Sequence, residues 1–247
     1  MHDKYHDSAG VPWEGRQFES NTWAGDSGLA PAELASALAM QPLDKKILFD
    51  TLAKSRLLIP LVAELGESGV GAHGQVVDKS ADLAIVAVST PDGKTAIPAF
   101  SSVEEMSKWK AQARPVPVAA AKIALAAASE GHERVVIDPA SSAIAVRRPA
   151  LAALAQGLDW LPPHKNPRVK ELVSMAAVTQ SKISSVDLFD YDPTGRLEKA
   201  ELLIQLGLTP GITPDQLKDL LEGFNQELQT QEFIALVDSI AMKIVVA

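Results

Sequence analysis

The sequence predicts an α+β protein, with a mixed sheet and covering helices in an N-terminal domain and a smaller α/β domain at the C-terminal end. Three observations lead to this prediction. Short apolar runs typical of strands alternate with helix-like segments along most of the chain. Hydrophobic residues make up 47% of the 247 residues, which is sufficient for a sizeable core. A stretch with three prolines in eight residues, 160–167, stiffens the chain between the two groups of segments.

These features divide the chain into three parts. Residues 1–30, here called the leader, are expected to be an irregular N-terminal arm. The N-terminal domain is expected over residues 31–160, and the smaller C-terminal domain over residues 167–247.

Five helices are expected in the N-terminal domain, and residues at their ends indicate where they begin and stop. Pro31 suits a first helical turn, where its missing N–H has no partner to lose. Asp44 is a candidate N-cap for the second helix. Ser102 is a candidate N-cap for the third, where Glu105 completes a capping box, and Gly131 ends the fourth. The expected ranges are 31–40, 44–54, 103–110, 119–130 and 149–157.

Strands are expected where short apolar runs lie between turn-forming residues. Pro60 lies inside the first run and cannot donate to a ladder, which predicts a sheet edge or a bulge there. Asp92 and Gly93 lie between two runs and predict a hairpin. Pro115 and Pro117 disfavour a helix and predict an extended chain. The expected ranges are 56–63, 83–89, 95–100, 114–118, 135–138 and 143–148.

The segment 64–80 is predicted to be a mobile surface loop. It holds four glycines and little hydrophobic pattern. Because these glycines do not lie between a strand and the start of a helix, they match neither the dinucleotide-binding pattern nor the P-loop pattern.

The C-terminal domain is expected to have the order helix, strand, strand, helix, strand. This order favours a small sheet whose helices cover one face. Thr213 and Pro214 form a strong start signal for the last helix. The expected ranges are 168–181, 183–191, 200–207, 214–229 and 239–246.

Composition excludes several classes of chemistry. The net charge of −8 argues against a nucleic-acid interface, which needs a concentrated basic face. The absence of cysteine excludes disulfides, thiolate catalysis and cysteine-ligated metal sites. No apolar stretch approaches the roughly 20 residues of a membrane helix, and the N-terminus has no apolar signal-peptide core. We therefore expect a cytoplasmic protein with no membrane contact, no cofactor and no metal, and no catalytic residue can be assigned.

The most informative stretch lies in the leader, at residues 15–28. It mixes two aromatic residues, fixed charges, amides and three glycines, whereas a simple tether is poor in aromatic residues. This composition predicts that the leader binds a surface, either on its own domain, on a protein partner or on a second copy of the chain. The candidate partner-binding residues are Arg16, Phe18, Asn21, Trp23 and Asp26.

Several short stretches, taken together and in order, resemble the actinobacterial branch of the SseB family. They are 15–28, Ala99-Phe100-Ser101-Ser102, Trp109, 113–118, Ile137-Asp138-Pro139, 148–151 and 206–211. The family commonly has a second acidic residue where this chain has Ser27. The resemblance implies a family named for a serine-sensitivity phenotype and without an assigned reaction. A sulfurtransferase reaction, sometimes linked to a similar name, needs a nucleophilic cysteine that this chain lacks.

Residues 190–201 match the calcium-binding loop template at six positions. Asp190, Asp192 and Glu201 would supply carboxylates, and Gly195 the sharp turn. Against this, no second loop of the kind exists, and the preceding segment is a poor entering helix. The alternative is a β-hairpin with an Asp-Pro-Thr-Gly turn. Calcium binding is thus the alternative to a regulatory or protein-interaction role.

Two further features have a chemical and a structural interpretation. Residues 25–28 have the Gly-Asp-Ser-Gly order of the chymotrypsin-like nucleophile loop, but the helix-rich pattern contradicts that β-barrel, which favours a turn or docking loop. Arg114, Arg147 and Arg148 lie near strand ends, where they could bind an anion or pair with acids on the surface.

Overall fold

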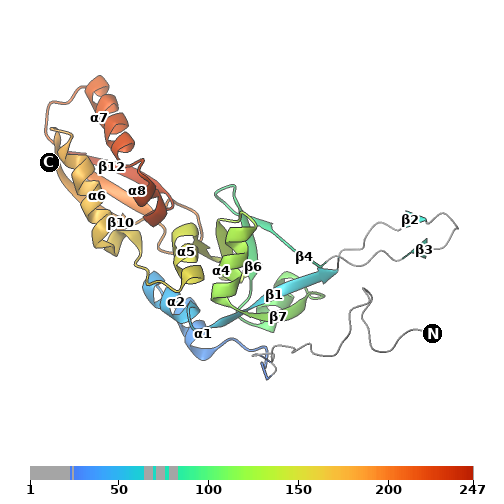
Figure 1. Cartoon of the computed structure of the whole chain (residues 1–247). Helices are drawn as coiled ribbons and strands as arrows, with labels where there is room; N and C mark the ends of the chain where they lie inside the picture. Colours follow the sequence, from blue (N-terminus) through green and yellow to red (C-terminus); the bar gives the residue numbers. More distant parts are fainter. Residues whose placement is uncertain (1–22, 24, 64–68, 71–75, 78–82, 247) are drawn as a thin grey trace.

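The computed structural model describes residues 23, 25–63, 69–70, 76–77 and 83–246 (Figure 1). Within this part of the chain, two large hydrophobic clusters and a small third one, formed by Leu58, Phe100 and Met106, make up the core. The first cluster is built from buried residues between Leu34 and Leu154, and the second from buried residues between Val169 and Val237. Helices and mixed sheets surround both, so the predicted α+β class is confirmed. The domain boundaries at 31–160 and 167–247 stay a prediction.

Two short helices lead from the leader into the first cluster. Asp44 caps the second of them, because its carboxylate accepts hydrogen bonds from the backbone N–H of Lys46 and Ile47 at 2.9 and 3.1 Å. Leu48, Phe49 and Leu52 then lie buried on one side of that helix. The two helices are α1 (Ala32–Leu38) and α2 (Lys45–Leu52).

The first sheet has strand β1 in its centre, so the predicted edge or bulge at Pro60 is wrong. Leu58 exchanges two backbone hydrogen bonds with Phe100, on the side of β1 that faces away from β7. Because backbone groups alternate along a strand, the nitrogen of Pro60 also faces away from β7, where it interrupts no ladder bond. Pro115 and Pro117 pair with Pro60 and Leu58 and follow the same rule. The sheet order is β4 (Leu83–Ile85), β1 (Arg56–Ala63) and β7 (Arg114–Ala119).

The second sheet contains the predicted hairpin and one parallel pair. The backbone N–H of Thr90 donates to Lys94, and Gly93 has a φ of 79°, so the turn at Asp92–Gly93 is confirmed. The predicted single strand 83–89 is wrong, because β4 and β5 belong to different sheets. The sheet order is β5 (Val88–Ser89), β6 (Thr95–Ala99), β8 (Arg134–Ile137) and β9 (Ile144–Arg147), with β6 parallel to β8.

Three more helices belong to this part of the chain. The first connects β6 to β7, the second connects β7 to β8, and the third follows β9. Ser102 caps α3 through the Glu105 N–H at 3.2 Å, but the predicted capping box does not form, because the Glu105 carboxylate binds Lys108 and Ser141. The helices α4 and α5 stop, as predicted, at glycines with φ of 76° and 65°. They are α3 (Val103–Trp109), α4 (Ala120–Ser129) and α5 (Arg148–Gln156).

Two predicted loop regions contain regular structure. In the segment 64–80, β2 (Gly69–Val70) and β3 (Val76–Val77) pair with each other, and the other residues lie outside the described part. The proline-rich connection at 160–167 contains a short 3-10 helix, η1 (Pro163–Lys165). Trp160 packs 5.4 Å from Phe49 between ring centroids, so this connection is fixed to the first cluster.

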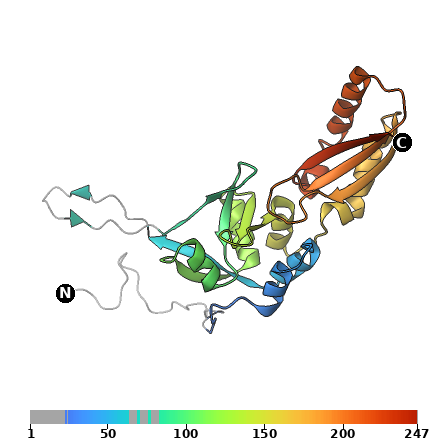
Figure 2. The same ribbon diagram turned by 180° about the vertical axis from the view of Figure 1, so that it is seen from behind.

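The C-terminal part is a three-stranded sheet with helices on one face, as predicted (Figure 2). The middle strand directs Leu202, Ile204 and Leu206 into the second cluster beneath these helices. The sequence prediction missed one helix, α8, which the Thr230 side chain caps through the Phe233 N–H at 3.2 Å. The elements are α6 (Pro167–Val178), β10 (Ile183–Asp190), β11 (Leu202–Leu208), α7 (Pro214–Glu227), α8 (Gln231–Leu236) and β12 (Ile240–Val246).

Candidate functional site

The end of the leader is bound to the body of the protein by an ion pair. Asp26 accepts two hydrogen bonds from the Arg56 guanidinium, 2.6 Å from Nε to Oδ2 and 3.0 Å from Nη2 to Oδ1. Arg56 begins β1, and its side chain is only 3% exposed. A two-point pair of this kind fixes orientation as well as distance. Asp26 is thus held in one position on the surface of the first sheet.

Further hydrogen bonds extend this ion pair into the core. Arg56 also donates to the backbone oxygen atoms of Ser101, at 2.6 Å, and of Leu29, at 2.5 Å. Ser101 in turn donates to the Asp138 carboxylate from its backbone N–H at 2.8 Å and from its Oγ at 2.7 Å. We call Asp26, Arg56, Ser101 and Asp138 the leader anchor.

The leader anchor lies at the carboxyl ends of the parallel strands β6 and β8. Ser101 follows β6 and Asp138 follows β8 directly. Asp138 has a φ of 51°, a backbone conformation that most residues avoid. Three of the stretches that carried the family resemblance, at 25–28, 99–102 and 137–139, therefore meet at one place in the fold. This edge is also where α/β sheets commonly place functional groups.

The fold shifts the pKa values of the two carboxylates of the leader anchor in opposite directions. The hydrogen bond from Arg56 lowers the pKa of Asp26, so this carboxylate is charged at neutral pH. Burial raises the pKa of Asp138, although its hydrogen bonds from Ser101 oppose the shift. The charge-assisted contact that holds the leader is therefore the one between Asp26 and Arg56.

The Gly-Asp-Ser-Gly stretch forms the turn that docks the leader, which supports the turn interpretation. The Asp26 Oδ1 atom accepts a hydrogen bond from the Gly28 N–H at 2.8 Å, and the Gly28 oxygen accepts one from Val103 at 2.8 Å. Gly28 has a φ of 74°, and a Cβ atom there would lie 2.6 Å from Val103 Cγ2. Ser27 is exposed, and its Oγ atom accepts a hydrogen bond from the Leu29 N–H at 3.4 Å.

A groove of about 960 Å³ opens beside the leader anchor. Trp23, which is half-buried, and Asp26 line it from the leader. Leu29, with 72% of its surface exposed, and Ile47, with 43%, add apolar surface to its walls. Two of the five predicted partner-binding residues, Trp23 and Asp26, are thereby brought together. The other three, Arg16, Phe18 and Asn21, lie outside the described residues.

A second polar cluster joins the two halves of the molecule and was missed from the sequence. Asp238 Oδ2 accepts hydrogen bonds from Arg134 Nη2 at 2.8 Å and from Arg147 Nη1 at 2.9 Å. Arg147 also donates to Asp192 at 2.6 Å, and Arg134 to Asp92 at 2.9 Å. We call these five residues the buried ion network. The prediction that Arg147 pairs on the surface or binds an anion is wrong, because its side chain is 6% exposed and its partners are carboxylates of this chain.

The three carboxylates of the predicted calcium loop bind separate partners within this chain. Asp190 lies 2.6 Å from Lys45 Nζ, and Asp192 also accepts a hydrogen bond from the Leu197 N–H at 3.0 Å. Glu201 accepts one from the Asp238 N–H at 2.7 Å. Within the residues that the structure describes, no three or more His, Asp or Glu side chains lie close enough together to hold a metal ion. The geometry therefore gives calcium binding no support, and the strands on either side form the hairpin of the alternative interpretation.

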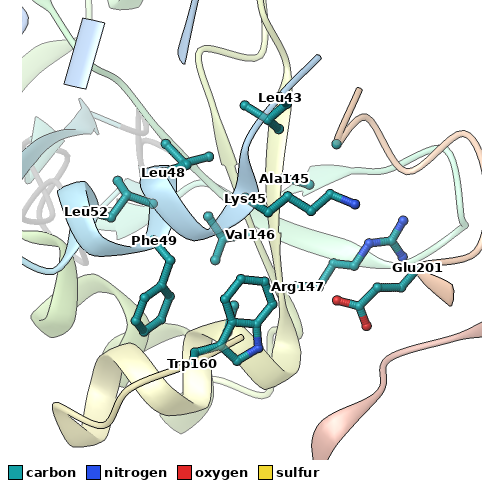
Figure 3. Close-up of a pocket in the computed structure, with 12 residues that line it drawn as sticks. Leu43, Lys45, Leu48, Phe49, Leu52, Ala145, Val146, Arg147, Trp160 and Glu201 are labelled. Atoms are coloured by element: carbon teal, nitrogen blue, oxygen red, sulfur yellow. The ribbon is translucent and has the colours of Figure 1, made fainter. Parts of the chain in front are cut away.

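Glu201 closes a small cavity between the two halves (Figure 3). The Phe49 and Trp160 rings lie on one side of the cavity, and Arg147 and Glu201 on the other. Burial raises the pKa of Glu201 to about 7, because the charged carboxylate is poorly solvated there. The cavity measures about 30 Å³, which holds a water molecule but no substrate. The cavity is lined mainly by residues of the first hydrophobic cluster.

A comparison with protein families matches the part of the chain that contains the first two sheets. The SseB protein N-terminal domain matches residues 32–153. No match is found among curated proteins or solved structures. None of the helices in the described ranges has the length and apolar character needed to span a lipid bilayer. The matched domain runs from the start of α1 into α5 and includes three of the four residues of the leader anchor. The chain belongs to the SseB family.

Proposed function

We propose that this protein acts by binding another protein, in a regulatory or interaction role, rather than by catalysing a reaction. The leader would carry the contact through Arg16, Phe18, Asn21, Trp23 and Asp26. The observation that supports this proposal is the two-point ion pair between Asp26 and Arg56, which fixes the end of an aromatic segment beside a groove.

Fixing one end of a binding segment favours association. A free segment loses conformational entropy when it binds, and this loss weakens the complex. The anchor at Asp26 removes part of that loss beforehand, because the chain from residue 26 onward is already held. The leader would therefore bind more tightly as part of this protein than as an isolated peptide.

The surroundings of Trp23 suit a protein partner. Leu29 and Ile47 are exposed apolar side chains in the groove, and Asp50 and Lys54 line the same groove with opposite charges. An apolar centre with a polar rim is the usual composition of a protein interface. A partner chain or a second copy could both provide the matching surface. We also propose that the protein acts in the cytoplasm. Its assignment to the actinobacterial branch of the SseB family stays a prediction.

Two truncations separate the contact from its anchor. Removing residues 1–22 leaves Asp26 in place, and should abolish partner binding while the melting temperature stays unchanged. Removing residues 1–28 should abolish partner binding and also lower the melting temperature, because Arg56 loses the Asp26 carboxylate. Binding is measured by affinity capture and by oligomeric state, and stability by calorimetry.

The matched control is Ser27→Ala, which changes an exposed residue of the same turn. This variant should behave as the unchanged protein in all three measurements. If the chain without residues 1–28 keeps its partners, its oligomeric state and its melting temperature, the proposed function is wrong.

A further inference from the structure

The C-terminal sheet leaves one of its two faces without a covering layer. Figure 2 shows the strands in front of the helices, with no helix on the near side of β10, β11 and β12. On the far side, alternate residues of β11 are fully buried under the helices. The intervening residues, Leu203 and Gln205, are only partly buried. We call the uncovered side the open sheet face.

The strand registers define three rows of residues on the open sheet face. Side chains that are paired in register lie on the same face, so each row crosses the whole sheet. The apolar row includes Phe189, which is 45% exposed. The rows are Phe189–Leu203–Ala241, Asp187–Gln205–Lys243 and Ser185–Gly207–Val245.

The middle row places one acid and one base at opposite edges of the sheet. Asp187 lies on the edge strand β10, and Lys243 lies on the other edge strand, β12. Both side chains are exposed, and neither forms an ion pair or a hydrogen bond with another residue in the described part of the chain. The open sheet face therefore carries a separated pair of opposite charges with an uncharged centre.

We propose that the open sheet face binds the same face of a second copy of this chain, with Asp187 of each copy opposite Lys243 of the other. A two-fold axis that runs parallel to the strands, between the two sheets, exchanges the two edges and keeps each row opposite itself. It creates two ion pairs, places Leu203 against its own copy, and sets Phe189 opposite Ala241. An axis perpendicular to the strands, also between the sheets, would instead bring two Asp187 side chains together, which is repulsive. Aligned packing is also a usual arrangement for two sheets in face-to-face contact.

The size of the face predicts weak association. Three strands about 4.8 Å apart, each of about seven residues, cover roughly 300 Å² of sheet, well below the roughly 800 Å² per partner of a standard interface. We therefore expect a dimer with a dissociation constant on the order of 0.1–1 mM at low salt. The open sheet face shares no residue with the leader anchor, so this inference and the proposed function can fail separately.

Sedimentation velocity on the full chain, from low micromolar to about 1 mM protein at low salt, tests the proposal together with charge reversal. Asp187→Lys alone and Lys243→Asp alone should each produce monomers, because like charges then face each other twice. The double variant, with both substitutions in one chain, should dimerise as the unchanged protein does. An equimolar mixture of the two single variants should also dimerise, because each copy then supplies the charge that the other needs.

The controls change net charge by the same amounts at exposed positions of α7, away from the face. They are Asp219→Lys and Lys218→Asp, and both should dimerise normally. A protein that stays monomeric up to about 1 mM would overturn the proposal. So would a dimer that the single variants leave intact, since that dimer would use another surface, such as a free strand edge.

Discussion

The leader anchor and the buried ion network both join distant parts of the chain through arginine and aspartate, yet they differ in exposure. In the network, Asp238 is fully buried and binds two arginines, each of which has a second carboxylate. In the anchor, the Arg56 side chain is 3% exposed but that of Asp26 is 14% exposed and lies at the protein surface. The centre of the network, where Arg134 and Arg147 meet Asp238, is therefore closed to solvent, although Asp92 at its edge is 24% exposed. The anchor, by contrast, is a single ion pair whose carboxylate can be reached by solvent from one side. This difference predicts that breaking the network costs more stability than breaking the anchor.

The largest expected effect is that of Asp238→Ala in the buried ion network. Without this carboxylate, Arg134 and Arg147 lose a shared partner in a site that solvent does not reach. Breaking a buried ion pair in this way costs about 3–5 kcal/mol. Urea denaturation should show the loss. A cost below about 1 kcal/mol, which is typical of surface pairs, would remove the distinction between the two regions.

The second effect is a fall in stability as the pH rises. The folded state raises the pKa of Glu201 from 4.5 to about 7, so it binds this proton more tightly than the unfolded chain does. The contribution is fully present below pH 4.5, decreases between pH 4.5 and 7, and is lost above pH 7. The expected loss between pH 5 and 8 is about 2–3 kcal/mol.

The variant Glu201→Gln should remove this pH dependence. His164, whose pKa is lowered by burial, produces a change of the opposite sign near its ordinary pKa, but it is present in both proteins. The difference between the two stability profiles therefore isolates Glu201. Profiles that stay parallel from pH 5 to 8 would show that Glu201 does not titrate in this range.

The third effect is that of Asp26→Asn in the leader anchor. The variant keeps the shape of the side chain but removes the charge that Arg56 binds at two points. The loss should be about 2 kcal/mol, smaller than in the network, because solvent can reach the freed guanidinium from the leader side. Urea denaturation measures it. A loss equal to that of Asp238→Ala would mean that the anchor is as sealed as the network.

The smallest effect is expected at an exposed pair. Arg168 binds Glu232 at 2.7 and 2.8 Å, but both side chains are about half exposed. Solvent screens such pairs, so Glu232→Gln should leave the urea midpoint unchanged. A clear shift of that midpoint would show that distance alone, without burial, decides the strength of these contacts.

The sequence predicted the parts of the fold that depend on neighbouring residues. The N-caps at Asp44 and Ser102, the turn at Gly93 and the helix end at Gly157 are all specified within a few residues of the chain. The family resemblance was likewise based on local stretches. These signals were sufficient for the α+β class and for most strands and helices.

The parts that could not be predicted depend on residues far apart in the chain. Arg147 meets partners that are 45 and 91 residues away, and nothing near it in the sequence indicates which. Pro60 predicted a sheet edge or a bulge, but its nitrogen points to the side of β1 away from β7, where it replaces no ladder hydrogen bond. That orientation follows from the bridge between Leu58 and Phe100, which are 42 residues apart in the chain. Composition made Asp26 a candidate partner-binding residue, and this stays a prediction; only the fold shows that Asp26 pairs with Arg56 of the same chain.

The central claim is that Asp26 holds the leader on the body of the protein. Amide hydrogen exchange at the turn of residues 25–28 tests this claim most directly. In the unchanged protein, the N–H groups of Gly28 and Val103 should exchange slowly, because both are hydrogen-bonded within the docked turn. In Asp26→Asn both should exchange much faster, while Ile204 in β11 stays protected. Equal exchange rates at Gly28 and Val103 in the two proteins would contradict the claim.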